Sequence, residues 1–133
     1  MNNALNLIGR LLLVALFLPA GLSKLSGFEG TVGYIDSVGL PLPALAAAAA
    51  MALEILGSIA LLLGYQTRLV SAVLAIFTLV ASIFFHAFWA VAPEQAFVQQ
   101  LLFFKNIGVI GGLLVLASSG AGAWSLDAKK QAD

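Results

Sequence analysis

The sequence has no cysteine and very little charge. Among its 133 residues, Asp, Glu, Lys and Arg together make up 9%. Without a thiol the chain forms no disulfide and offers no thiolate to a metal or an iron–sulfur cluster. A water-soluble domain carries roughly 25% charged residues. The chain therefore has too few charges to cover a surface that faces water on all sides.

An excess of one sign of charge is also missing. Six basic and six acidic residues give a formal net charge of zero, and they form no block along the sequence. We therefore expect no binding to nucleic acid and no capture of partners by a strong surface field. The chain has one histidine, so paired histidine ligation of a haem would need two copies of the chain. We expect no metal site.

Hydrophobic residues are abundant instead. They make up 62% of the chain, the mean hydropathy is +1.06, and four apolar stretches approach the roughly 20 residues that cross a bilayer as a helix. Inside lipid, backbone groups must be paired within their own segment, which favours helices. The sequence predicts an all-α integral membrane protein in contact with the lipid bilayer. Its single domain, residues 1–133, is expected to be a four-helix transmembrane bundle with spans at about 5–22, 45–63, 69–91 and 101–117.

The connections between these spans differ in length. Residues 64–68 form a short turn, so the second and third spans are expected to be antiparallel neighbours. The first connection is longer, and its apolar residues recur at helical spacing opposite Glu29 and Asp36. This pattern predicts a short amphipathic helix in the membrane interface. An ordinary surface loop is the alternative.

The positions of lysine and arginine predict the orientation. Loops kept in the cytoplasm are enriched in these residues. The end of the bundle that holds both termini would carry four of them, and the other end would carry Lys24 and Lys105. We therefore expect both termini to be cytoplasmic. The four residues at the end with the termini are Arg10, Arg68, Lys129 and Lys130.

Glu54 is the charged residue expected to lie deepest in the bilayer. It occupies the midpoint of the second span, where an isolated charge costs roughly 2.5 to 3.5 kcal/mol. Such a residue usually faces the bundle interior and pairs with another group. Lys105 and Arg10 are the two candidate partners, and the sequence does not choose between them.

Three other polar residues are expected near the depth of Glu54. They are His86 near the end of the third span, and Lys105 and Asn106 near the start of the fourth. Together with Glu54 they predict an outward-opening, ligand-binding polar pocket inside the bundle. Two plainer interpretations stay open: a buried ion pair can serve only to fix helix register, and His86 can belong to an interfacial aromatic belt.

The remaining charged residues are expected to have structural or ion-pairing roles. We predict that Asp127 pairs with Arg10 or Arg68 and so holds the C-terminal tail against the bundle, and we place Lys24 in the same structural group. A Gly-x-x-x-Gly spacing within residues 108–112 permits close helix contact. We interpret this spacing as a site of helix packing within the bundle, and contact between two copies of the chain in a homo-oligomer is the alternative.

Taken in order, the motifs of the chain resemble those of the DoxX family of small bacterial membrane proteins. The matching positions cover almost the whole chain: Gly9 and Arg10, Gly21 and Lys24, residues 27–31 and Tyr34, residues 39–41, Glu54 and Gly57, Gly64, Thr67 and Arg68, Phe85 and His86, Phe88 and Trp89, Lys105 and Asn106, residues 120–122 and residues 125–127.

This resemblance implies a location and a role. Members of the family are inner-membrane proteins, some of which are small subunits of quinone-dependent oxidoreductases or scaffolds for redox enzymes. The expected function is an accessory or scaffold subunit, with quinone as the candidate cofactor and a membrane redox enzyme as the candidate partner. Catalysis by this chain alone is not expected, because it has no cysteine, no dinucleotide-binding fingerprint and no haem ligand pair. The alternatives are a small proton-coupled transporter, in which Glu54 titrates, and a purely structural assembly protein.

Overall fold

The computed structural model describes residues 2–131 and contains helices but no strand in that range. Four helices are long and apolar enough to cross a membrane: α1, α3, α4 and α5. The prediction of an all-α, four-span membrane protein is thus confirmed. The helices in chain order are α1 (Asn3–Ser26), α2 (Phe28–Ser37), α3 (Pro43–Leu63), α4 (Thr67–Phe85), α5 (Pro93–Ser119) and α6 (Leu126–Lys130).

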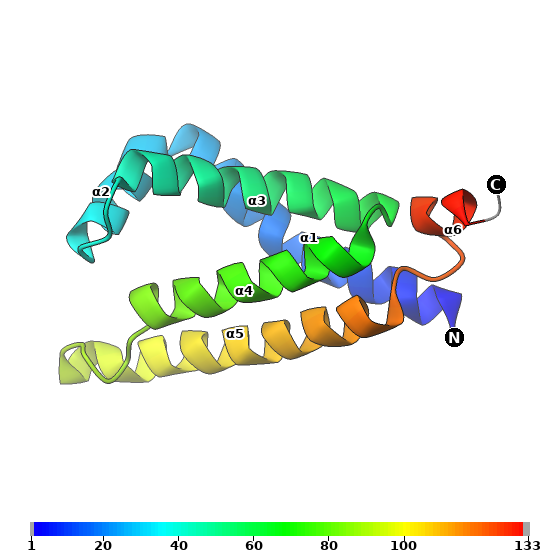
Figure 1. Cartoon of the computed structure of the whole chain (residues 1–133). Coiled ribbons are helices and arrows are strands. Elements are labelled where there is room, and N and C mark those ends of the chain that lie inside the picture. Colours follow the sequence, from blue (N-terminus) through cyan, green and yellow to red (C-terminus); the bar gives the residue numbers. More distant parts are fainter. Residues whose placement is uncertain (1, 132–133) are drawn as a thin grey trace.

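The four long helices form two closely packed pairs. α1 packs against α3, and α5 packs against α4; α3 and α4 are also in contact, whereas the backbones of α1 and α5 do not come close to each other. Both ends of the described chain, residues 2 and 131, lie at the same end of the bundle, which we call the terminal end (Figure 1). The opposite end, where α2 lies beside the start of α3, is called the far end. This even number of crossings places both termini on one side of a membrane.

Local sequence signals explain where several helices begin and end. Asn2 caps α1 by accepting hydrogen bonds from the amides of Ala4 and Leu5, at 3.1 and 3.2 Å. α3 and α5 both start with proline, which has no amide hydrogen to leave unpaired. α3 ends at Gly64, whose φ of 66° is left-handed and favours glycine.

Two span boundaries differ from the sequence-based prediction. The third span was predicted to run to residue 91, but α4 ends at Phe85 and a turn follows it. The fourth was predicted to begin at residue 101, but α5 begins at Pro93. Apolarity was a poor guide here, because residues 86–92 are apolar yet form turns, whereas the first two turns of α5 carry Glu94 and several glutamines.

The predicted short helix between the first two spans is present as α2. It packs against α3 and buries Ile35 there. Tyr34 reaches across to α4, where its hydroxyl donates to the carbonyl of Phe85 at 3.4 Å. α2 therefore closes the far end of the bundle from one side.

Few side chains are buried within the chain itself, as expected for a bundle that is surrounded by lipid. A small core of apolar residues joins the long helices between the middle and the terminal end. Buried hydroxyls on α4 bond to carbonyls one turn back, Thr78 to Leu74 at 2.7 Å and Ser82 to Thr78 at 2.6 Å. The core consists of Val14, Phe17, Leu61, Leu74, Ala75, Leu113 and Leu116.

Arginine side chains hold the terminal end by binding free carbonyls. Arg10 is completely buried and donates to the carbonyls of Leu61, at 3.1 Å, and Trp124, at 2.6 Å. Arg68 donates to the carbonyls of Ala117, at 3.2 Å, and Ser118 at the end of α5. The last carbonyls of a helix have no partner within it, so a nearby guanidinium satisfies them.

Asp127 binds backbone amides and forms no ion pair with an arginine in the described chain, so our prediction of a pair with Arg10 or Arg68 is wrong. Its two carboxylate oxygens accept from the amides of Gln66, at 2.7 Å, and Thr67, at 2.9 Å. The reason is that the free amides at the start of α4 attract a carboxylate, while both arginines are taken by carbonyls. The C-terminal tail is therefore held against the bundle, but by Asp127 capping the start of α4 rather than by an ion pair.

The environment of Asp127 lowers its pKa below the ordinary value. Burial of the carboxyl raises the pKa, but the hydrogen bonds from Thr67 and Gln66 and the charge of Lys130 together lower it by more. A carboxyl whose folded-state pKa is depressed stabilises the fold above its unfolded pKa, and this contribution is lost as the pH falls through the folded value.

Replacing Asp127 with Asn should loosen the tail, because one amide oxygen cannot accept both backbone hydrogens as the carboxylate does. We expect the contact to weaken by about 1 kcal/mol at neutral pH. The fluorescence of Trp124, followed during unfolding in a Trp89→Phe background, measures this. In the parent the tail should also loosen as the pH falls through the lowered pKa of Asp127, whereas the Asn variant should lose this pH dependence. An identical pH profile in both proteins would contradict the assignment.

The orientation remains a prediction with a direct test, because the chain contains no native cysteine. Single cysteines at the exposed positions Ser37 and Gln131 can be labelled in intact cells with a membrane-impermeant maleimide. If both termini are cytoplasmic, Ser37→Cys is labelled at once and Gln131→Cys only after the membrane is opened. The reverse pattern would place the termini outside.

Candidate functional site

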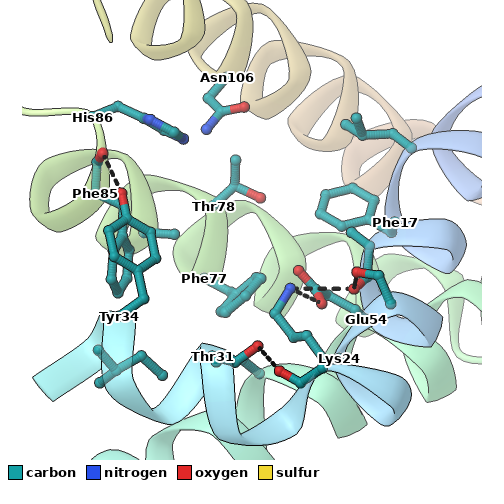
Figure 2. A pocket seen from close by; sticks show the side chains of 18 of the residues that line it. Phe17, Lys24, Thr31, Tyr34, Glu54, Phe77, Thr78, Phe85, His86 and Asn106 are labelled. Carbon is teal, nitrogen blue, oxygen red and sulfur yellow. Dashed lines mark hydrogen bonds and ion pairs between the residues drawn. The ribbon is translucent and has the colours of Figure 1, made fainter. Parts of the chain in front are cut away.

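The far half of the bundle contains a partly open cavity of about 530 Å³. α1, α2, α3, α4 and α5 all contribute to its wall, and Figure 2 shows polar side chains on different sides of it. The four residues predicted to form a polar pocket, Glu54, His86, Lys105 and Asn106, all line this one cavity. The other lining residues are Leu16, Phe17, Ala20, Ser23, Lys24, Gly27, Gly30, Thr31, Tyr34, Ile35, Ala50, Phe77, Thr78, Ala81 and Phe85.

Glu54 pairs with Lys24, which corrects our two candidate partners. The Lys24 Nζ atom lies 2.7 Å from Glu54 Oε2, and Glu54 is buried. Lys24 Nζ also lies 3.3 Å from the carbonyl of Ala20. Neither Lys105 nor Arg10 contacts Glu54: Lys105 sits on α5, which packs against α4, and Arg10 is held by carbonyls at the terminal end.

The close approach of α1 to α3 explains this pairing. Gly21 lies at their crossing, where a Cβ atom would come within 2.9 Å of Glu54 Cβ and 2.7 Å of Ile55 Cγ1. Only glycine leaves room for the two helices at that distance. Lys24 follows less than one turn later on the same helix, so its side chain can bend back to Glu54, as Figure 2 shows.

His86 and Asn106 make separate contacts on the α4–α5 side of the cavity. His86 Nδ1 lies 2.8 Å from Gln99 Oε1, and the Asn106 amide donates to the Ser82 hydroxyl at 2.9 Å. His86 is the residue that ends α4, so its ring stands at the rim of the bundle. In the tautomer that donates from Nδ1 to Gln99, Nε2 can accept a hydrogen bond.

Lys105 differs from the other polar residues of the cavity. It is exposed, and it makes no hydrogen bond or ion pair with any residue in the range 2–131. An intramembrane charge usually faces the bundle and has a partner. Lys105 lies on the cavity wall, and Lys24, rather than either of the two candidates Lys105 and Arg10, is the counter-ion of Glu54.

Aromatic rings form much of the remaining wall. Phe17, Phe77 and Phe85 come from α1 and α4, and Tyr34 comes from α2. The rings of Tyr34 and Phe85 lie 5.0 Å apart. Flat apolar faces beside hydrogen-bonding groups are typical of sites for small ring-containing ligands.

The contribution of α2 was missed by sequence reasoning. Thr31 and Tyr34 line the cavity, although the amphipathic pattern of α2 suggested contact with the membrane interface instead. The spacing of three residues that places Thr31 and Tyr34 on one helix face was the available signal. Lys24 was recognised as an ion-pairing residue, but its partner depended on the α1–α3 crossing, which composition does not reveal.

Packed apolar side chains separate the cavity from the terminal end. Val14 and Leu61 are both buried and lie along α1 and α3 between Glu54 and the Arg10 site. The cavity is therefore a pocket of the far half rather than an evident route across the bundle. Among residues 2–131 there is no group of three His, Asp or Glu that could hold a metal ion.

These features define a class: a small helical membrane protein with a polar pocket between its spans. The DoxX family model matches residues 5–87, so the chain belongs to the DoxX family. It is 36% identical over 121 residues to inner membrane protein YphA of Escherichia coli, covering 91% of this chain and 86% of that protein. It is 37% identical over 124 residues to inner membrane protein YqjF of the same organism, covering 91% and 88%. The chain is accordingly a DoxX-family inner membrane protein.

A more distant relative is eukaryotic. ER-derived vesicles protein ERV29 of Saccharomyces cerevisiae is 32% identical over 79 residues, which cover 59% of this chain and 26% of that protein. No solved structure matches the chain. The two bacterial relatives therefore supply the comparison that covers most of this chain.

Replacing Gly21 with Ala should destabilise the bundle by about 1 to 3 kcal/mol, because the added methyl group would collide with Glu54 and Ile55. Thermal unfolding of the purified protein in detergent measures the change. Gly9→Ala is the matched control, since Gly9 is on the same helix and a Cβ there would meet no atom within 4 Å. Equal unfolding temperatures for the two variants would show that the crossing is not tight.

Proposed function

We propose that this protein is a membrane-embedded binding subunit that holds a lipophilic, quinone-like ligand in the cavity of its far half. In this role it serves as an accessory or scaffold subunit of a membrane oxidoreductase system. The observation that carries the proposal is a cavity of about 530 Å³ with aromatic walls and hydrogen-bonding groups on opposite helix pairs. Pockets for small molecules and cofactors are typically about 300 to 1,000 Å³.

The polar groups suit a ring with oxygen atoms on opposite sides. Lys24 donates to Glu54 and Ala20 and has a third ammonium hydrogen for a ligand carbonyl. On the α4–α5 side, the ammonium group of Lys105 can serve the second carbonyl. For the reduced ligand, Glu54 and His86 Nε2 are acceptors for the hydroxyl groups. Both redox forms of a quinone thus find partners in the same cavity.

The accessory role rests on the family resemblance and on the chemistry of the chain. The chain has no cysteine, so thiol relay would have to come from a partner protein. Binding and orienting a ligand needs only the cavity and its polar groups. An accessory subunit that presents a lipophile to a redox enzyme fits these properties better than an autonomous enzyme.

The two alternative functions are less well supported. A proton-coupled transporter needs a polar route to both ends, whereas the apolar core lies between the Lys24–Glu54 pair and the terminal end. A purely structural assembly protein needs only a filled interior, whereas this bundle leaves a cavity beside its intramembrane charges. Both observations favour ligand binding.

The proposal predicts that a benzoquinone binds the purified protein and that removing the ion pair weakens binding. Removing only Glu54 would leave Lys24 as an unpaired, partly buried charge and destabilise the fold. The informative variant is therefore Lys24→Met with Glu54→Gln, which removes both charges. Because hydrogen bonds to charged groups contribute about 1.5 to 3 kcal/mol, we expect the Kd to rise about tenfold or more.

Lys129→Met with Glu94→Gln is the matched control, because it removes one charge of each sign at exposed positions outside the cavity. Titration calorimetry or quenching of tryptophan fluorescence gives the Kd. The control should bind as the parent does. If the parent binds no benzoquinone, or if the cavity variant binds it equally well, the proposed function is wrong.

A further inference from the structure

A second hollow runs along the outside of the bundle between α1 and α5. Its volume is about 550 Å³, and it lies where the backbones of these two helices do not come close to each other. We call it the α1–α5 groove. Its lining residues are Leu5, Asn6, Gly9, Leu12, Leu13, Leu16, Lys105, Val109, Gly112, Val115, Leu116 and Ser119.

The α1–α5 groove meets the cavity at two shared residues. Leu16 on α1 and Lys105 on α5 line both spaces. These residues therefore stand between the two spaces, at a place that we call the junction, and a molecule that occupies both spaces must pass beside their side chains. Only a ligand that extends beyond the cavity would occupy both spaces.

The chemistry of the α1–α5 groove changes along its length. Lys105 is charged at the cavity end, and Asn6 and Ser119 are polar at the terminal end, where Asn6 Nδ2 donates to the carbonyl of Gly120 at 2.8 Å. Between these ends the lining residues are aliphatic or glycine. Gly9 and Gly112, from opposite walls, have no atom within 4 Å of a Cβ position. This middle section suits a hydrocarbon chain.

The length of the α1–α5 groove restricts which chain it fits. From Lys105 to Ser119 the α5 backbone rises about 21 Å, whereas one leaflet is half of a hydrocarbon core about 30 Å thick. A single chain that follows the groove from the junction to its end must span that rise of about 21 Å. A long isoprenoid chain meets this requirement.

Lys105 is the charged residue at the junction of the cavity and the α1–α5 groove. It is exposed, lines both spaces and has no hydrogen-bond or ion-pair partner within residues 2–131. A charge at this depth calls for a polar partner. A ligand oxygen at the mouth of the cavity would provide one, while the chain attached to the same head group continues along the groove.

We propose that the α1–α5 groove binds the single long isoprenoid chain of the ligand whose head group occupies the cavity. The ligand enters sideways from the bilayer between α1 and α5, and Lys105 donates a hydrogen bond to an oxygen of the head group at the junction. This inference rests on the proposed function, and it specifies the ligand class as a lipid quinone with a long chain.

The test compares two probes: a benzoquinone without a chain and the same ring carrying a long isoprenoid chain. Gly112→Leu fills the α1–α5 groove, and the neighbouring Gly111→Leu is the matched control. Both glycines have free space around them, but only Gly112 lines the groove. We expect Gly112→Leu to weaken binding of the long-chain probe about tenfold and to leave the Kd of the chain-free probe unchanged. Gly111→Leu should change neither.

Each outcome separates the two proposals. If the parent binds neither probe, the proposed function and this inference both fail. If the parent binds both probes but Gly112→Leu and Gly111→Leu have the same affinity for the long-chain probe, the groove assignment is overturned while the cavity remains the head-group site. Lys105→Met should weaken binding of both probes, and an unchanged Kd would remove Lys105 from the site.

The bilayer itself supplies one competing occupant. Native mass spectrometry of the parent and of Gly112→Leu, both reconstituted with phospholipid and the long-chain probe, identifies the molecule that the substitution displaces. Loss of the long-chain probe supports the inference. Loss of phospholipid alone would show that an ordinary acyl chain fills the groove, which would overturn it.

Discussion

The cost of placing a carboxylate in the middle of a bilayer is the constraint on which this structure depends. Glu54 lies near the middle of α3, and the ammonium group of Lys24 compensates its charge at 2.7 Å. That contact requires α1 to cross α3 at the distance that Gly21 permits. With α1 committed to α3, it does not pack along α5. The Lys24–Glu54 pair thus supplies the charged groups of the cavity wall. The packing of α1 on α3 that goes with this pair also leaves the α1–α5 groove open.

Much of the fold could be predicted from the sequence, because lipid imposes simple rules on it. Four apolar stretches gave four spanning helices, and periodic apolar residues gave α2. The boundaries were less accurate where polarity and helicity disagree, as in α5, which begins at Pro93 among glutamines. The cavity residues Glu54, His86, Lys105 and Asn106 were found because charged and amide side chains are conspicuous in apolar helices.

The pairing of the charges could not be predicted in the same way. Depth along a helix was the only coordinate available, and it does not tell which helices are in contact. Lys24 lies beyond Gly21 on α1, and only the crossing at that glycine shows that it reaches Glu54. At the terminal end, Asp127 and the two arginines were expected to attract one another. Each instead satisfies the unpaired backbone groups of a helix end, which depend on where the helices stop.

The distribution of the tertiary hydrogen bonds has a mechanical consequence. Those that join α1 to the end of α5 and to the segment after it through side chains lie at the terminal end, from Asn6 to Gly120 and from Arg10 to Trp124. At the far end of the described chain, a single contact of 3.4 Å, from Tyr34 to Phe85, joins α2 to α4. Hydrogen bonds therefore hold the two helix pairs, which we call the two arms of the bundle, together mainly at the terminal end, which acts as a joint. A small change in the angle between the arms would widen or narrow the cavity without disturbing the joint or the Lys24–Glu54 pair, both of whose members belong to the same arm.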